Sequence, residues 1–279
     1  MNLVKDPLAE LDHEVSPGLI WKYPNRLLWL INYHCPSKCD FCFRKELNDR
    51  RTIPSKLSYV KELIKKQPTI VEVIFSGGEP LEVIGLLHQS ILDISHIKQI
   101  KIFRIHTRQP IAFPDKIDWK LLLELPQKIK QPIYLAIHVN HSREIDNPKV
   151  TKAITKLRRA GYILLSQSVF LRGVNDEVEV LEALFEKLIA LGVKPYYIFH
   201  CDAMKHTQKK VVPIAKEIRI MTALRKRVSG LAYPLHVIDT TSGSGKIPVS
   251  TDFWKADVSS YSDFSGVWSA VSAGADSSD

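Results

Sequence analysis

Residues 23–45 read YPNRLLWLINYHCPSKCDFCFRK, and this stretch decides how the rest of the chain is interpreted. Residues 27–33 are leucine, isoleucine and aromatic residues with one asparagine, a composition typical of a buried β-strand. Three cysteines follow within eight residues, at Cys35, Cys39 and Cys42. The stretch therefore predicts a first strand with a cysteine-rich loop at its carboxyl end.

Similar apolar runs recur along the chain and alternate with longer amphipathic stretches. The predicted strands span residues 27–33, 71–75, 100–105, 133–138, 162–170, 196–199 and 235–238. Residues 55–66, 81–94, 118–125, 147–160, 176–191 and 214–228 carry apolar residues at helical spacing. Strands that alternate with helices indicate parallel βα units. The pattern suits an α/β fold, either an incomplete (β/α)6 TIM-like barrel or a doubly wound sheet.

Polar residues follow nearly every predicted strand. In both candidate folds the chemistry gathers at the carboxyl ends of the strands. The residues at these ends are His34-Cys35, Ser76-Gly77-Gly78-Glu79, His106-Thr107-Arg108, His138, Gln167 and His200-Cys201-Asp202. A scaffold protein does not need this pattern, so we expect an enzyme.

Composition and charge narrow the class of protein further. Hydrophobic residues make up 45% of the 279 residues and charged residues 25%, which excludes a largely disordered chain or a disulfide scaffold. The apolar runs are shorter than the roughly 20 residues that span a bilayer, and the N-terminus lacks a secretory signal, so we expect a cytoplasmic protein without a membrane partner. The net charge of +9 comes from scattered Lys and Arg pairs without interleaved aromatic residues. This favours solvated helix faces over nucleic-acid binding.

The cysteine cluster favours iron–sulfur over zinc. In a cytosolic enzyme such a cluster is metal-binding or catalytic before it is a disulfide framework. A structural zinc needs four closed ligands, and His34, the candidate fourth ligand, should point away from Cys35 in an extended segment. Three thiolates on a [4Fe–4S] cluster would leave one iron open to an exogenous ligand. The distant Cys201 is interpreted as a small buried apolar side chain.

A second motif lies near the C-terminal end of the predicted barrel, where residues 242–248 read SGSGKIP. The phosphate-binding P-loop pattern fails, because Thr240 stands in place of its first glycine and Ile247 in place of its Ser/Thr. A lysine on a glycine-rich arm can form a Schiff base with pyridoxal phosphate (PLP), whereas a solvated loop lysine is the simpler alternative.

The cysteine motif followed one βα unit later by SGGE resembles the radical S-adenosylmethionine (SAM) superfamily. Residues 21–252 are similar to the lysine 2,3-aminomutase family in the order of their motifs. The matching stretches are YPNRLLWLINYHCPSKCDFCFRK, IFSGGEPL, IHTRQP, NHSREID, LLSQSVFLRGVND, KPYYIFHCD and SGSGKIPV.

This resemblance implies the radical SAM type of incomplete (β/α)6 barrel and three cofactors. Cys35, Cys39 and Cys42 would hold a [4Fe–4S] cluster, whose open iron chelates SAM and yields a 5′-deoxyadenosyl radical. Ser76, Gly77, Gly78 and Glu79 would bind the methionyl amino group, and His138 and Gln167 would surround SAM and the other cofactors. Lys246 would be the catalytic PLP lysine, with Lys22, Tyr23 and Arg26 at the PLP phosphate.

The resemblance also implies the substrate. Arg44 matches the arginine that pairs with the carboxylate of the amino acid, a task suited to guanidinium. Asp202 and Asp239 match the carboxylates that hold the side-chain ammonium. Two converging buried acids repel each other unless a cation enters, which favours a lysine-like substrate, although each acid could instead cap a helix or loop. We therefore expect an isomerase that converts L-lysine to β-lysine by 1,2-amino migration.

The expected domain organisation is an N-terminal extension at residues 1–20, the aminomutase domain at 21–254 and a flexible Ser-rich tail at 255–279. An electron donor such as flavodoxin or ferredoxin is the expected partner, and the oligomeric state stays open. One alternative is the relative that makes β-lysine for elongation factor P modification, and another is an aminomutase for a different amino acid. A radical SAM enzyme that modifies RNA and an inactive binding protein are alternatives from other classes.

Overall fold

The computed structural model describes residues 5–48, 53–240, 242, 245–254 and 260–270. Its main feature is a ten-stranded sheet whose strands lie in the order in which they occur along the chain. The seven parallel strands are β3 (Arg26–Asn32), β4 (Glu72–Gly77), β5 (Ile102–Thr107), β6 (Ile133–His138), β7 (Ile163–Val169), β8 (Lys194–Phe199) and β9 (Leu235–Asp239). The antiparallel strands β1 (Glu14–Ser16) and β2 (Leu19–Tyr23) lie before β3, and the antiparallel β10 (Lys246–Pro248) follows β9.

The strand order distinguishes the two candidate folds. A doubly wound sheet reverses its order at a switch point, whereas each parallel strand here pairs with the next one along the chain. Within the described ranges no pairing joins β1 to β10, so the barrel is incomplete. The predicted TIM-like architecture is confirmed, and all seven predicted strands occur within a few residues of their expected bounds.

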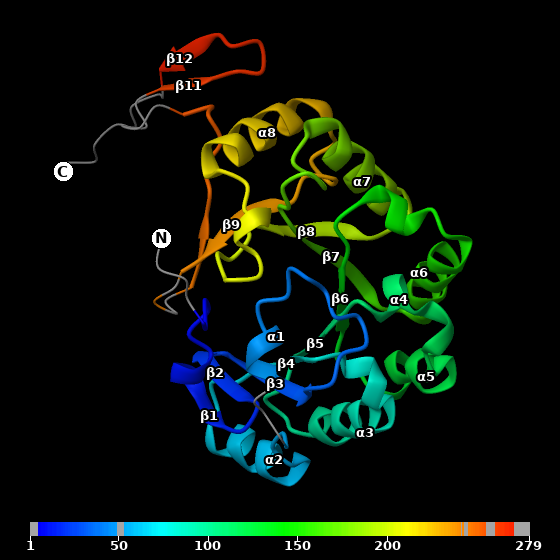
Figure 1. Cartoon of the computed structure of the whole chain (residues 1–279). Helices are drawn as coiled ribbons and strands as arrows, with labels where there is room; N and C mark the ends of the chain where they lie inside the picture. The colour runs from blue at the N-terminus through cyan, green and yellow to red at the C-terminus, as the bar shows by residue number, and fades with distance from the viewer. Residues whose placement is uncertain (1–4, 49–52, 241, 243–244, 255–259, 271–279) are drawn as a thin grey trace, which may run out of the picture.

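In the described part of the chain, six long helices surround the sheet on its outer side (Figure 1). They are α2 (Leu57–Lys66), α3 (Ile84–Ser95), α5 (Trp119–Lys128), α6 (Pro148–Ala160), α7 (Val178–Ala190) and α8 (Ile214–Arg227), each at a predicted position. Short turns of helix lie elsewhere along the chain, namely α1 (Lys45–Asn48), α4 (Gln109–Ala112), η1 (Leu11–His13), η2 (Pro80–Val83), η3 (Pro114–Lys116), η4 (Ser142–Ile145) and η5 (Gln208–Lys210).

Helix α6 illustrates why these helices form where they do. The Asn147 side chain accepts a hydrogen bond from the backbone N–H of Lys149, which satisfies a free donor at the helix start. Gly161 ends the helix in the left-handed conformation, with φ of 100°, that glycine adopts readily. Val150 and Leu157 are buried one above the other on the face toward the sheet.

The alternation of side chains along the strands separates a core from a cavity. In β5, Phe103 and Ile105 are buried in the hydrophobic core. Arg104 and His106 alternate with them and therefore lie on the other face, where they line a cavity inside the barrel. Because β5 presents a charged and a polar side chain to this cavity, the barrel interior can serve as a binding site.

The two ends of the chain contain more regular structure than the sequence indicates. The expected N-terminal extension at residues 1–20 includes η1, β1 and the start of β2, which joins the main sheet. Within the expected tail, β11 (Ser260–Ser262) and β12 (Trp268–Ala270) form an antiparallel hairpin. Residues 255–259 and 271–279 of that tail lie outside the described residues. In the parts of the chain that the structure describes, no helix combines the length and apolar character needed to cross a membrane.

Candidate active site

A cavity of about 380 Å³ lies inside the barrel, and every residue that the sequence predicts for the site lines it. These residues are Lys22, Tyr23, Arg26, Cys35, Cys39, Cys42, Arg44, Ser76, Gly77, Gly78, Glu79, His138, Gln167, Asp202, Asp239 and Lys246. They come from both halves of the chain, so their convergence depends on the complete sheet. The individual roles stay predictions.

The cysteine loop leaves the carboxyl end of β3 and curls over the cavity. Lys38 has a positive φ of 44°, and the Cys42 backbone N–H donates to the Cys39 carbonyl oxygen at 3.2 Å. These turns direct all three thiols to the cavity. Burial raises the pKa of each thiol, that of Cys39 to about 11, so binding a metal would release protons.

The surroundings of the loop distinguish possible metal ligands. The His34 side chain is 70% exposed and does not line the cavity, in agreement with the expected alternation. Phe41 stacks on the His138 ring at a centroid distance of 4.9 Å and holds the loop against β6. Among the described residues, no three His, Cys, Asp or Glu side chains lie close enough to share one metal ion. Separate irons of a cluster, each with its own thiolate, do not require such convergence.

The SGGE segment is fixed to the strand that carries the cysteines. The Gly78 N–H donates to the Asn32 carbonyl oxygen at 2.6 Å, and the Glu79 N–H donates to the His34 carbonyl oxygen at 2.9 Å. A Cβ at Gly78 would overlap the His34 carbonyl oxygen, and Gly77 has φ of 124°. Both positions therefore require glycine for close backbone approach.

The side chain of Glu79, the last residue of this segment, is buried. Its carboxylate accepts hydrogen bonds from the Thr107 hydroxyl at 2.5 Å and from the backbone N–H groups of Leu81 and Arg108 at 3.1 and 2.9 Å. Burial raises the pKa of Glu79 to about 6, although these hydrogen bonds act in the opposite direction. Glu79 thus links the SGGE segment to the carboxyl end of β5.

Two buried histidines present unused nitrogen atoms in the cavity. Burial, assisted by Arg108, lowers the pKa of His138 to about 3, and burial lowers that of His106 well below its usual value. Both rings are therefore neutral near pH 7. Their Nε2 atoms are buried without a hydrogen-bond partner among the described residues, so each can donate to or accept from a ligand. The sequence named His106 as a polar residue at the carboxyl end of a strand without assigning it a role, and the structure places it in the cavity.

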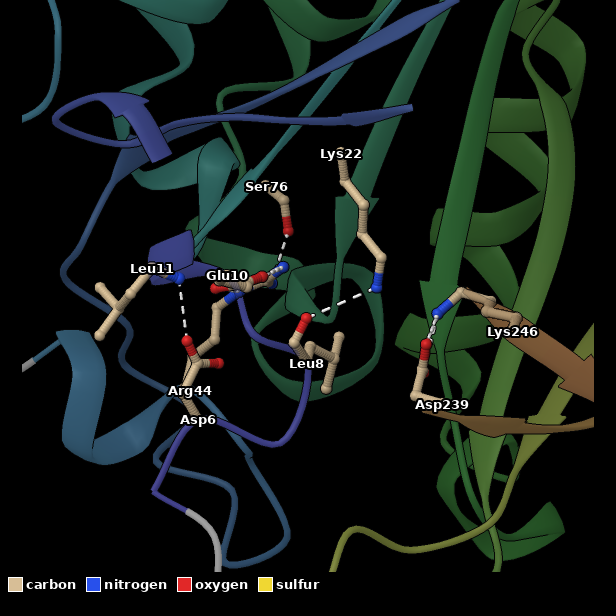
Figure 2. A network of polar contacts seen from close by, with 9 residues as sticks. All are labelled: Asp6, Leu8, Glu10, Leu11, Lys22, Arg44, Ser76, Asp239 and Lys246. Atoms are coloured by element: carbon tan, nitrogen blue, oxygen red, sulfur yellow. Dashed lines mark hydrogen bonds and ion pairs between the residues drawn. The ribbon is translucent and has the colours of Figure 1, made fainter. Parts of the chain in front are cut away.

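The basic end of the site contains a pair that the sequence interpretation missed. The Glu10 carboxylate accepts from Nη2 and Nε of Arg44 at 2.6 and 2.9 Å, and Arg44 Nη1 donates to the Ser76 hydroxyl at 3.0 Å (Figure 2). Glu10 lies in the segment interpreted as an extension. Nearby, Lys22 Nζ donates to the Leu8 carbonyl oxygen at 3.5 Å, and burial lowers the pKa of Lys22.

The acidic end is built by the hairpin of β9 and β10. The register pairs Lys246 with Asp239, and Lys246 Nζ donates to both carboxylate oxygens at 2.6 and 2.7 Å. The same ammonium lies 4.8 Å from the centroid of the Phe199 ring. Burial, together with the charge of Asp239, raises the pKa of Asp202 to about 7. This end therefore suits an ammonium group.

The candidate phosphate corner joins β2, β3 and the glycine-rich loop. The Arg26 guanidinium carbon lies 3.7 Å from the centroid of the Tyr23 ring. Gly245, with φ of 136°, is close enough that a Cβ there would contact the Tyr23 hydroxyl. Arg26 and Lys22 bring positive charge to this corner of the cavity. Residues 243 and 244 of the predicted loop lie outside the described residues.

A buried polar cluster lies behind the acidic end and was also missed. The Glu217 carboxylate on α8 contacts His200 Nδ1 at 3.0 Å and His236 Nε2 at 2.9 Å. Glu217 is fully buried, and these contacts give its carboxylate hydrogen-bond partners away from solvent. The cluster ties α8 to β9 and to the residue that follows β8.

Comparison with known proteins gives consistent results. The chain shares 36% identity with the L-lysine 2,3-aminomutase of Fusobacterium nucleatum, over 89% of this chain and 59% of the relative. It shares 36% with that of Buchnera aphidicola, over 89% of this chain and 74% of the relative, and 38% with that of Escherichia coli, over 82% and 67%. The chain thus spans about three fifths of the Fusobacterium protein's length. No family model matches the chain.

Solved structures support the fold. A radical SAM methyltransferase from Sphaerobacter thermophilus superposes with a TM-score of 0.56 at 14% identity, over 79% of this chain and 68% of that protein. A methylornithine synthase superposes with a TM-score of 0.51 at 13% identity, over 78% and 67%. At these identities the likeness concerns the fold alone.

Proposed function

The chain belongs to the lysine 2,3-aminomutase family, and we propose on that premise that it is an isomerase that converts L-lysine to β-lysine. The proposed cofactors are a [4Fe–4S] cluster, SAM and PLP. When bound, the cluster and SAM supply a 5′-deoxyadenosyl radical, and PLP supplies the aldehyde that carries the migrating amino nitrogen.

One observation carries the choice of substrate, namely that the cavity has a carboxylate-binding end and an ammonium-binding end. The carboxylate of Glu10 lies on Arg44, and the ammonium of Lys246 lies on Asp239. The chain thus provides its own examples of a bound carboxylate, which every amino acid carries, and of a bound ammonium, which distinguishes lysine from most amino acids. Figure 2 shows the two pairs at separate places in the site.

The donor groups in the cavity fit the proposed cofactors. Cys35, Cys39 and Cys42 supply thiolates for three irons of the cluster. The SGGE segment approaches the cysteine loop through backbone contacts that only glycine permits, which suits a small polar ligand beside the cluster. The neutral rings of His106 and His138 can orient bound groups without adding charge.

The PLP end and the substrate end share Lys246. This lysine would hold PLP before substrate binds, with Arg26 and Lys22 at the phosphate. Release of Asp239 from the Lys246 ammonium would leave that carboxylate available to the substrate ammonium, next to Asp202. Phe41 and Phe199 line the cavity, and their rings would help to keep water away from the bound groups.

The proposed electron donor follows from the chemistry of the iron–sulfur cluster. The cluster needs a one-electron donor, for which a flavodoxin or ferredoxin is suitable, and reducing surroundings such as the cytoplasm. The alternative that supplies β-lysine to elongation factor P uses the same reaction and differs in the fate of the product.

The test is anaerobic reconstitution with iron, sulfide and PLP, followed by SAM, a reductant and L-lysine. We expect β-lysine, measured by chromatography and mass spectrometry after derivatisation. Turnover of a different amino acid with no product from lysine would overturn the substrate and leave the mechanism. A purified, oxygen-protected protein that binds zinc in place of iron would overturn the whole proposal.

A further inference from the structure

Glu10 uses only part of the hydrogen-bonding capacity of Arg44. A guanidinium has five N–H donors. Glu10 accepts from Nε and Nη2, and Ser76 accepts from Nη1. One N–H on each Nη nitrogen is left after these contacts. These two donors form the end-on edge of the group when the Ser76 hydroxyl takes the Nη1 hydrogen that points toward Cδ. That edge has the geometry that binds a second carboxylate through two parallel hydrogen bonds.

The segment that carries Glu10 is anchored beside the cavity. The Asp6 carboxylate accepts from the Leu11 N–H at 2.9 Å, and the Ala9 N–H donates to the Asp6 carbonyl oxygen at 3.2 Å. Lys22 holds the Leu8 carbonyl oxygen from the other side (Figure 2). Three contacts therefore define the position of this short turn.

Burial makes each member of the Glu10–Arg44 ion pair depend on the other. The side chains are only 3% and 12% exposed, so neither charge can turn to solvent when the other is absent. Loss of the carboxylate would leave guanidinium donors unpaired and the group free to rotate toward other acceptors.

We propose that Glu10 is a positioning residue for the substrate carboxylate, because it holds Arg44 side-on and directs the end-on edge of the guanidinium to the cavity. This inference rests on the proposed function, since it requires an amino acid carboxylate at Arg44. The opposite interpretation is that Glu10 occupies the place of the substrate carboxylate and competes with it. The two interpretations predict changes of opposite sign when Glu10 is replaced.

The experiment measures binding to the reconstituted enzyme with SAM present and no reductant, so that no turnover occurs. Isothermal titration calorimetry compares L-lysine with 1,5-diaminopentane, which keeps both amines and lacks the carboxylate. We expect Glu10→Gln to weaken L-lysine binding about tenfold or more, because a charge-assisted contact to Arg44 is lost. Binding of 1,5-diaminopentane should change less than about twofold. The matched control is Glu62→Gln, which removes an exposed carboxylate paired with Lys66 and should change neither affinity.

Steady-state rates give a second measurement. We expect the KM for L-lysine to rise in parallel with its dissociation constant. The kcat should change little, since Glu10 does not touch the reacting atoms. Tighter or unchanged L-lysine binding by Glu10→Gln would overturn the proposal, the former in favour of competition. Equal weakening of both ligands would also overturn it, because that result indicates a general loss of structure.

A second variant covers the case in which Glu10→Gln does not fold. Asp6→Ala removes the side-chain acceptor of the Leu11 N–H and keeps Glu10, so L-lysine binding should weaken a few-fold with 1,5-diaminopentane unaffected. Unchanged L-lysine affinity in that variant would overturn the proposal. If the unmodified enzyme binds no L-lysine, the proposed function fails. If it binds L-lysine and the variants do not differ from it, only the role of Glu10 fails.

Discussion

Binding of lysine should depend on pH through Asp202. Burial and the neighbouring Asp239 carboxylate raise the pKa of Asp202 to about 7, whereas Lys246 and His200 lower it. A protonated Asp202 cannot pair with an ammonium group, so a substrate side chain binds only the deprotonated form. The affinity for L-lysine should therefore rise as the pH rises through 7.

The size of this effect follows from the titration of one carboxyl group. With a pKa of about 7, roughly one tenth of Asp202 is ionised at pH 6 and roughly nine tenths at pH 8. The dissociation constant for L-lysine should thus be about tenfold larger at pH 6 than at pH 8. Isothermal titration calorimetry on the reconstituted enzyme without reductant measures it directly.

Two controls test whether this change of the dissociation constant with pH comes from Asp202. Norleucine keeps the carboxylate and α-amine and lacks the side-chain ammonium, so its affinity should vary much less over this range. Asp202→Asn should bind L-lysine weakly at both pH values and show no step. A tenfold step that persists in Asp202→Asn would refute the assignment, as would equal L-lysine affinities at pH 6 and pH 8.

Three further predictions test other parts of the site. Lys246→Ala should abolish β-lysine formation with iron and sulfide content unchanged, and undiminished product from it would remove the argument for PLP. Gly78→Ala should lower the melting temperature and prevent SAM binding, because its Cβ would overlap the His34 carbonyl oxygen, and normal SAM titration would contradict this. Glu217→Ala should cost about 3–5 kcal/mol of unfolding free energy in guanidinium chloride, since it removes a buried carboxylate from two imidazoles. A loss below about 1 kcal/mol would mean that the contacts of Glu217 with His200 and His236 contribute little to stability.

The positions of the strands and helices could be predicted because the local hydrophobic pattern of each segment agrees with its place in the fold. Each parallel strand is a short run dominated by β-branched, aromatic or leucine side chains, and each long helix has an apolar face that the sheet buries. The choice between a barrel and a doubly wound sheet could not be made from these patterns, because it depends on which strands pair. The sequential pairing from β3 to β9 decides it.

Much of the candidate site could be predicted from motifs, and the parts that were missed share a physical reason. Glu10 lies 34 positions before Arg44, and Glu217 lies 17 and 19 positions from its two histidines. Such pairs depend on how separate elements pack, which no local spacing encodes. His106 is a different case, because the sequence places it at the carboxyl end of a strand, but only the structure shows that its side chain lines the cavity.

The pairing of charges inside the cavity explains why Asp202 should control substrate choice. Before any ligand binds, Arg44 is paired with Glu10 and Asp239 with Lys246, so those buried charges are already compensated. Within the described part of the chain no cation forms an ion pair with Asp202, which agrees with the raised pKa of its carboxyl group. An incoming ammonium therefore gains most where a carboxylate has no partner of its own. A neutral side chain would leave Asp202 either protonated or uncompensated, and the cavity would discriminate against it at this residue.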